Sequence, residues 1–138
     1  MLKACVQWIA RFLLVAIPTV AFAGQVQVKE SDPMWLVMCE DRISAQTQRA
    51  RFMAFVEAHV MPPAEQAIVE GCTWAMFTLR LPIEDTDLEP VPHPHFPHSV
   101  VRYYRAAATF VNERRRGETV EGAYIQLPTV IAATLKSR

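Results

Sequence analysis

Glycine is scarce in this chain, and several catalytic signatures are missing with it. Only four of the 138 residues are glycine, and all four follow residue 23. The sequence contains no Gly-x-Ser-x-Gly nucleophile elbow, no His-Glu-x-x-His zinc motif and no glycine-rich phosphate loop. So few glycines also disfavour the tight turns that many catalytic loops use. We therefore expect no catalytic residues and no enzyme activity.

An excess of charge of one sign is also missing. The chain has 14 basic and 14 acidic residues, a formal net charge of zero. Without a basic excess, we expect neither a nucleic acid nor an anionic membrane surface as partner. The charges are unevenly placed, however. The acidic group is Glu84, Asp85, Asp87 and Glu89, and the basic group is Arg102, Arg105, Arg114, Arg115 and Arg116.

No apolar run is long enough to cross a bilayer, which takes about 20 residues. The longest run, residues 12–20, follows Lys3 and Arg11 and closes on Ala21-Phe22-Ala23. This order is typical of a signal peptide, with small residues at the cleavage site. We expect residues 1–23 to be cleaved, the remaining domain (24–138) to be periplasmic, and no membrane insertion afterwards. A retained membrane anchor is the alternative.

Cysteine is scarce as well: the chain has three, and Cys5 would leave with the signal peptide. Cys39 and Cys72 remain, and an oxidising compartment favours a disulfide between them. Closing a loop of this length contributes roughly 4 kcal/mol in the chain-entropy model. Two free buried thiols are the alternative. A disulfide would exclude a nucleophilic cysteine paired with His59.

Apolar spacing favours helices along most of the chain. Asp32-Pro33 is typical of a helix start, and Leu36, Cys39 and Ile43 follow at helical spacing. Ile68, Cys72, Ala75 and Leu79 form a second stripe. Two antiparallel helices joined at Pro62-Pro63 would bring both cysteines to one seam.

Residues 73–81 also alternate as in a strand. We favour a helix there, because the stripe begins earlier and includes Cys72. Trp35 and Trp74 each lie within a turn of a cysteine. We expect them to pack against the disulfide, with partner-facing aromatics as the alternative.

Two more helices are expected in the second half. Ser99 can cap a helix from residue 100 that ends at Gly117. A last apolar stripe runs from Val120 to Leu135, with Pro128 kinking it or starting a fresh helix. The predicted fold is an all-α, single-domain bundle of four or five helices with one disulfide and a long proline-rich loop.

That loop, residues 82–98, contains five prolines, which favour extended and exposed chain. We expect it to be a binding loop, with a tolerated linker as the alternative. Its candidate binding residues are Asp85, Asp87, Glu89, His93, His95, Phe96 and His98. The three histidines suit zinc or copper. No cysteine or firmly placed carboxylate completes a ligand set, so we expect no metal and no cofactor. Arg102 and Arg105 are the candidate partner surface.

Several motifs resemble the periplasmic immunity proteins that neutralise type VI secretion amidase effectors. They are Cys39, Cys72 with Trp74, Val-Val-Arg-Tyr-Tyr at residues 100–104, and Ile-Ala-Ala-Thr-Leu at residues 131–135. The resemblance implies a small, helical, disulfide-bonded protein, often a homodimer, that plugs the cleft of a cell-wall-degrading enzyme.

We therefore expect a small exported inhibitor or immunity protein that occludes a secreted cell-wall hydrolase. A non-catalytic accessory subunit of an envelope or secretion assembly is one alternative. A periplasmic metal-handling or acid-stress protein is another, because small periplasmic acid-stress chaperones are also helical and held by one disulfide.

Overall fold

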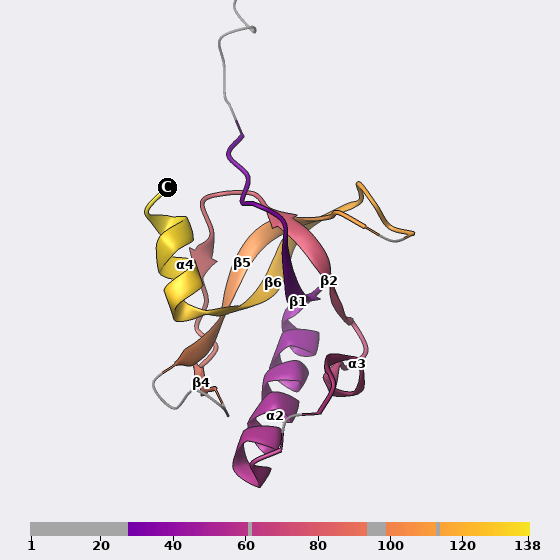
Figure 1. Cartoon of the computed structure of the whole chain (residues 1–138), viewed down its shortest axis with the longest axis vertical. Coiled ribbons are helices and arrows are strands. Elements are labelled where there is room, and N and C mark those ends of the chain that lie inside the picture. Colours follow the sequence, from indigo (N-terminus) through magenta and orange to yellow (C-terminus); the bar gives the residue numbers. More distant parts are fainter. Residues whose placement is uncertain (1–27, 61, 94–98, 113) are drawn as a thin grey trace, which may run out of the picture.

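The computed structural model describes residues 28–138, apart from residues 61, 94–98 and 113. The predicted signal peptide at 1–23 lies outside the described residues. Figure 1 shows the elements, which are, in chain order, β1 (Met34–Cys39), α2 (Arg42–Ala58), α3 (Ala64–Ala67), β2 (Cys72–Leu79), β3 (Glu84–Asp85), β4 (Val91–Pro92), β5 (Val100–Phe110), β6 (Thr119–Pro128) and α4 (Thr129–Lys136). The described chain is thus mostly β-structure, and the predicted all-α bundle of four or five helices is wrong.

The six strands of the described residues form one antiparallel sheet. Its order is β2-β1-β6-β5-β3, and β4 also pairs with β5. The far end of β2 leaves β1 and pairs with β5, Phe77 opposite Phe110 and Leu79 opposite Ala108. This second pairing brings the sheet back on itself, so that β2, β1, β6 and β5 enclose the main core.

The two faces of these strands bury different clusters. Leu36, Phe77, Tyr104 and Ile125 face the main core, which Ala132 and Leu135 of α4 close. The strand residues that alternate with them, together with Ala45 of α2 and Leu88, form a second cluster. Its strand members are Val37, Cys39, Tyr103 and Tyr124. Strands buried on both faces read as continuous apolar runs rather than as alternation.

This two-sided burial explains why helices were expected from residue 100 to Gly117 and from Val120 to Leu135. Tyr103 and Tyr104 are neighbours on β5, and both are buried, one in each cluster. Apolar side chains on both faces of a strand also satisfy helical spacing over short runs. The strand alternative for residues 73–81 is confirmed by β2, and the fresh helix expected after Pro128 is confirmed by α4.

The helix expected from Asp32-Pro33 is a strand, β1, and the helix proper begins at Arg42. Asp41 caps it, with its carboxylate accepting from the Ser44 amide at 2.7 Å. α2 ends where His59 adopts a left-handed conformation, before Pro62 and Pro63. The helix expected after Pro63 is only the four residues of α3. None of the helices in the described part of the chain has the length and apolar character needed to span a membrane.

The disulfide between Cys39 and Cys72 is confirmed. It does not join two helices, however, since the cysteines face each other across the paired strands β1 and β2. The disulfide therefore cross-links the two strands that also contain Trp35 and Trp74.

The proline-rich segment is not uniformly exposed. Ile83, Leu88 and Val91 are buried, and the Thr86 hydroxyl donates to the Tyr103 carbonyl at 2.7 Å. Residues 83–92 thus pack on the sheet through β3 and β4.

Candidate binding groove

An apolar cavity of about 480 Å³ opens between the second half of α2 and the sheet. We call it the tryptophan groove. Its lining consists of residues 34–37, Gln48, Phe52, Phe55, Pro62, Ala67, Ile68, Trp74, His93, Val101, residues 126–128 and Ile131. Cavities of this size and apolar character are typical binding sites in small proteins.

The groove opens where two strands separate. β1 pairs with β6 only from Val37 to Cys39, opposite Gln126 to Tyr124. Beyond Gln126, β6 stays with β5 as far as Pro128, whereas β1 stays with β2 as far as Met34. Residues of both strands therefore line the cavity at this point.

Two tryptophans dominate one side of the groove. Trp35 and Trp74 stack with their ring centroids 5.7 Å apart and their planes at 29°. They come from neighbouring strands, where Trp74 lies opposite Val37 and Trp35 opposite Met76. Trp35 is 48% exposed and Trp74 is 38% exposed. The pair is therefore not buried against the disulfide as expected, but presents aromatic surface at the groove.

Helix α2 supplies the opposite side. Its only buried residues are Ala45 and Gln48, so its second half projects below the strands in Figure 1 with Phe52 and Phe55 half-buried. The Gln48 amide fixes the segment after α3, donating to the Ala67 carbonyl at 2.8 Å and accepting from the Val69 amide at 3.0 Å. This contact holds Ala67 and Ile68 at the groove.

The polar groups at the groove are few. The Tyr103 hydroxyl donates to Oε1 of Gln126 at 3.0 Å, and the burial of Tyr103 raises its pKa well above the usual value. With Oε1 engaged, the Gln126 side chain offers its amide Nε2 as a donor. His93 is the only histidine among the described residues that line the groove. The groove is thus equipped to bind an apolar group beside a hydrogen-bond acceptor.

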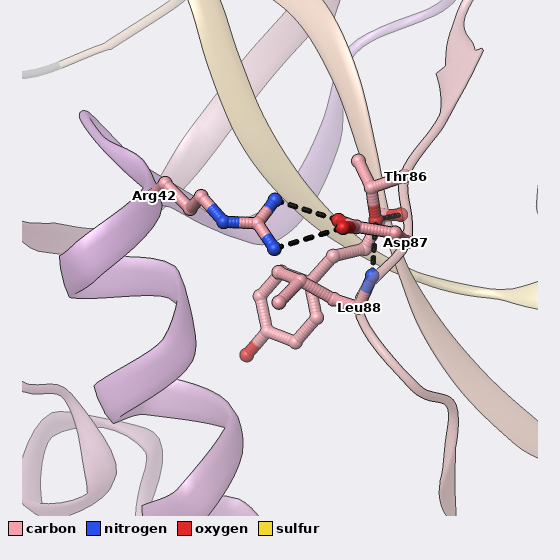
Figure 2. A network of polar contacts seen from close by, with 5 residues as sticks. Arg42, Thr86, Asp87 and Leu88 are labelled. Carbon is pink, nitrogen blue, oxygen red and sulfur yellow. Dashed lines mark hydrogen bonds and ion pairs between the residues drawn. The ribbon is translucent and has the colours of Figure 1, made fainter.

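The acidic residues proposed as a binding loop form ion pairs with cations of the same chain, as Figure 2 shows for Asp87. Asp87 accepts two hydrogen bonds from Arg42, at 2.6 and 3.0 Å, which lower the pKa of its carboxyl. Lys136 of α4 bonds Asp85 and lowers the pKa of that carboxyl in the same way. Arg49 donates to the Glu89 carbonyl at 2.6 Å. Residues 85–89 therefore join α2 and α4 to the sheet.

The other predicted site residues are scattered. His93 lines the groove, whereas His95, Phe96 and His98 lie outside the described residues. No group of three or more histidine, cysteine or acidic side chains that could hold a metal ion occurs among the residues described.

Arg102 and Arg105 both interact with groups of their own chain. The charge of Arg102 contributes to the lowered pKa of Asp85. Arg105 donates to the Gly122 carbonyl at 3.1 and 3.3 Å, lies over the Tyr124 ring and borders a second hollow of about 320 Å³.

Sequence reasoning missed the groove, because its walls come from seven separate segments between residues 34 and 131. The signal that was available is the position of Trp35 and Trp74 two residues from Val37 and Cys72, which puts them on the α2 face once strands are assumed. Comparison of the chain with protein families, with curated proteins and with solved structures finds no match.

Proposed function

We propose that this chain is a small exported binding protein. It binds a partner protein through the tryptophan groove and acts by this binding. The stacked and half-exposed pair of Trp35 and Trp74 carries the proposal. Contiguous exposed apolar surface on a small protein marks a site for a partner or ligand. Tryptophan is also among the residues most enriched in interface hot spots.

The proposed partner is a secreted cell-wall-degrading enzyme, whose activity the complex blocks. The expected signal peptide supports an exported partner, and the disulfide between Cys39 and Cys72 suits the same compartment. The positions of the cysteines and of Trp74 support the inhibitor class through the resemblance described above. The six-stranded sheet contradicts the helical fold that the resemblance implied, so only these positions and the compartment support the hydrolase as partner.

The proposal can be tested on an exported cell-wall hydrolase encoded beside this chain. The chain purified from the periplasm should inhibit digestion of peptidoglycan by that enzyme at equimolar concentration. Two of the three tryptophans, Trp35 and Trp74, remain once the leader with Trp8 is removed, and both line the groove. Their fluorescence should therefore change on mixing.

The matched variants are Trp74→Ala and Val130→Ala. Val130 is 67% exposed and lies beside Ile131, but it does not line the groove. Trp74→Ala should weaken inhibition at least tenfold, and Val130→Ala should leave it unchanged. Unimpaired digestion in the presence of the unaltered chain would contradict the proposal, as would full inhibition by Trp74→Ala.

A further inference from the structure

We infer that the partner enters the tryptophan groove as one extended segment, with a single aromatic side chain as its anchor and a hydrogen-bond acceptor beside it. The inference rests on the proposed function, because it names the part of the protein partner that the groove takes.

The groove is too small to enclose a whole helix. An α-helix with side chains is about 10 Å across, and two turns of it fill roughly 850 Å³. The groove offers about 480 Å³. A cavity of this volume takes one or two side chains and the backbone that carries them, so a helix or a broad face of a second copy could insert side chains only and would itself stay outside.

The shape of the groove favours extended chain. On the side away from β2, residues 34–36 of β1 have no register partner in β6 within the described residues. A peptide that lies along such a strand edge in extended form is a recurrent mode of recognition. Successive side chains of an extended segment point to opposite sides, so one residue can reach into the groove while its neighbours stay outside.

The walls of the groove favour an aromatic anchor. Trp35 and Trp74 already stack with each other, and their exposed surface lies at the groove. Phe52 and Phe55 lie on the facing helix. Aromatic rings prefer offset-stacked or edge-to-face neighbours, which a ring inserted between these walls would find.

Gln126 adds a polar requirement. Its Oε1 is engaged by the Tyr103 hydroxyl, and its Nε2 has no hydrogen-bond partner among the described residues. A donor that is covered by an apolar occupant without an acceptor loses its water and gains nothing. The occupant must therefore bring an acceptor, such as a peptide carbonyl or a phenolic oxygen, to this amide.

The inference is testable with blocked tripeptides, acetyl-Gly-Xaa-Gly-amide, in which Xaa is tyrosine, phenylalanine or alanine. The indole N–H signals of Trp35 and Trp74 report binding in NMR titrations of the chain purified from the periplasm. Both signals should shift saturably with the tyrosine and phenylalanine peptides, and the alanine peptide should bind at least tenfold more weakly.

Two groove variants test the two parts of the inference. Trp74→Ala should lower the affinity for the tyrosine peptide at least tenfold, and Val130→Ala should leave that affinity unchanged. Gln126→Glu keeps an oxygen that can accept from Tyr103 but loses the amide donor. It should therefore lower the affinity for the tyrosine and phenylalanine peptides three- to tenfold. Unchanged affinity in Gln126→Glu would overturn the acceptor requirement.

Three outcomes would overturn the inference as a whole. They are equal binding of all three peptides, tighter binding of a free aliphatic acid such as octanoate, and self-association in sedimentation that shifts the indole signals without peptide. If the hydrolase is inhibited in a Trp74-dependent way while no peptide binds, the inference fails and the proposed function stands. If the peptides bind as expected and the hydrolase is not inhibited, the proposed function fails.

Discussion

Residues 85–89 and the tryptophan groove both lie at the surface, but they differ in how far their side chains are engaged by the rest of the chain. In the acidic segment, Asp85, Asp87 and the Glu89 carbonyl are each bonded by a cation from α2 or α4. In the groove, Trp35 and Trp74 have each other and remain half-exposed.

The difference teaches where a surface still has binding capacity. Long cationic side chains can reach carboxylates from several elements, so an acidic loop is readily satisfied within its own chain. The aromatic surface of Trp35 and Trp74, in contrast, is left partly exposed by the side chains around it. The apolar groove is therefore the better candidate for a partner, although the acidic loop was the more conspicuous feature of the sequence.

The largest effect is expected from a pair of variants on one strand, Phe77→Ala and Trp74→Ala. Phe77 is fully buried in the main core, so its loss should lower the free energy of unfolding by about 3–5 kcal/mol. Trp74→Ala should cost less, about 2 kcal/mol, because the ring is partly exposed and its loss removes a smaller buried area together with one aromatic stack. Urea unfolding of both variants provides the measurement. Equal losses would mean that Trp74 is part of the core and that the groove is not a surface site.

The next effect concerns the staple between β1 and β2, the strands that carry both tryptophans. Replacing Cys39 and Cys72 together by alanine should lower the free energy of unfolding by about 2–5 kcal/mol. The unaltered chain unfolded in the presence of a reductant serves as the control and should show the same loss. A loss of unfolding free energy below about 1 kcal/mol would show that the strand pair forms its side of the groove without the disulfide.

Part of this molecule could be predicted from its sequence. The cysteine pair followed from the expected compartment, because only two cysteines remained to pair. The α4 start followed from Pro128, because proline acts on the backbone next to it. The fold class did not follow. Where Tyr103 and Tyr104 are buried on opposite faces of one strand, the apolar pattern no longer distinguishes a period of 2 from one of 3.6.

The candidate site was harder to predict for a different reason. Arg42 and Asp87 are 45 positions apart, and the groove residues are spread from Met34 to Ile131, so no local pattern predicts such contacts. Trp35 and Trp74 become neighbours only through the register that sets Leu36 opposite Ala75. A strand pairing therefore had to be known before the groove could be inferred.

Acid should act on the ion-paired residues first. Hydrogen bonds from Lys136, Arg42 and Arg115 lower the pKa of Asp85, Asp87 and Glu118 in the folded chain. Unfolded carboxyls titrate near pH 4. The unfolded chain therefore binds protons first, so this stabilisation is complete above about pH 5 and is lost as the pH falls through the lower folded values. Urea midpoints should be level from pH 7 to 5 and decline below pH 4, less steeply at 1 M NaCl. A level midpoint down to pH 3 would contradict these pairings.

The smallest effect, and the sharpest test of the comparison, is expected from exchanging the charges of Arg42 and Asp87. Both side chains are largely exposed, so Arg42→Asp or Asp87→Arg alone should lower the urea midpoint only slightly, and the double exchange should recover most of the loss. Binding of the tyrosine peptide should stay the same in all three variants, because neither residue lines the groove. If Asp87→Arg weakens the peptide as much as Trp74→Ala does, the acidic segment belongs to the binding surface. The ion-paired segment and the tryptophan groove would then no longer differ in binding capacity, since one partner would contact both.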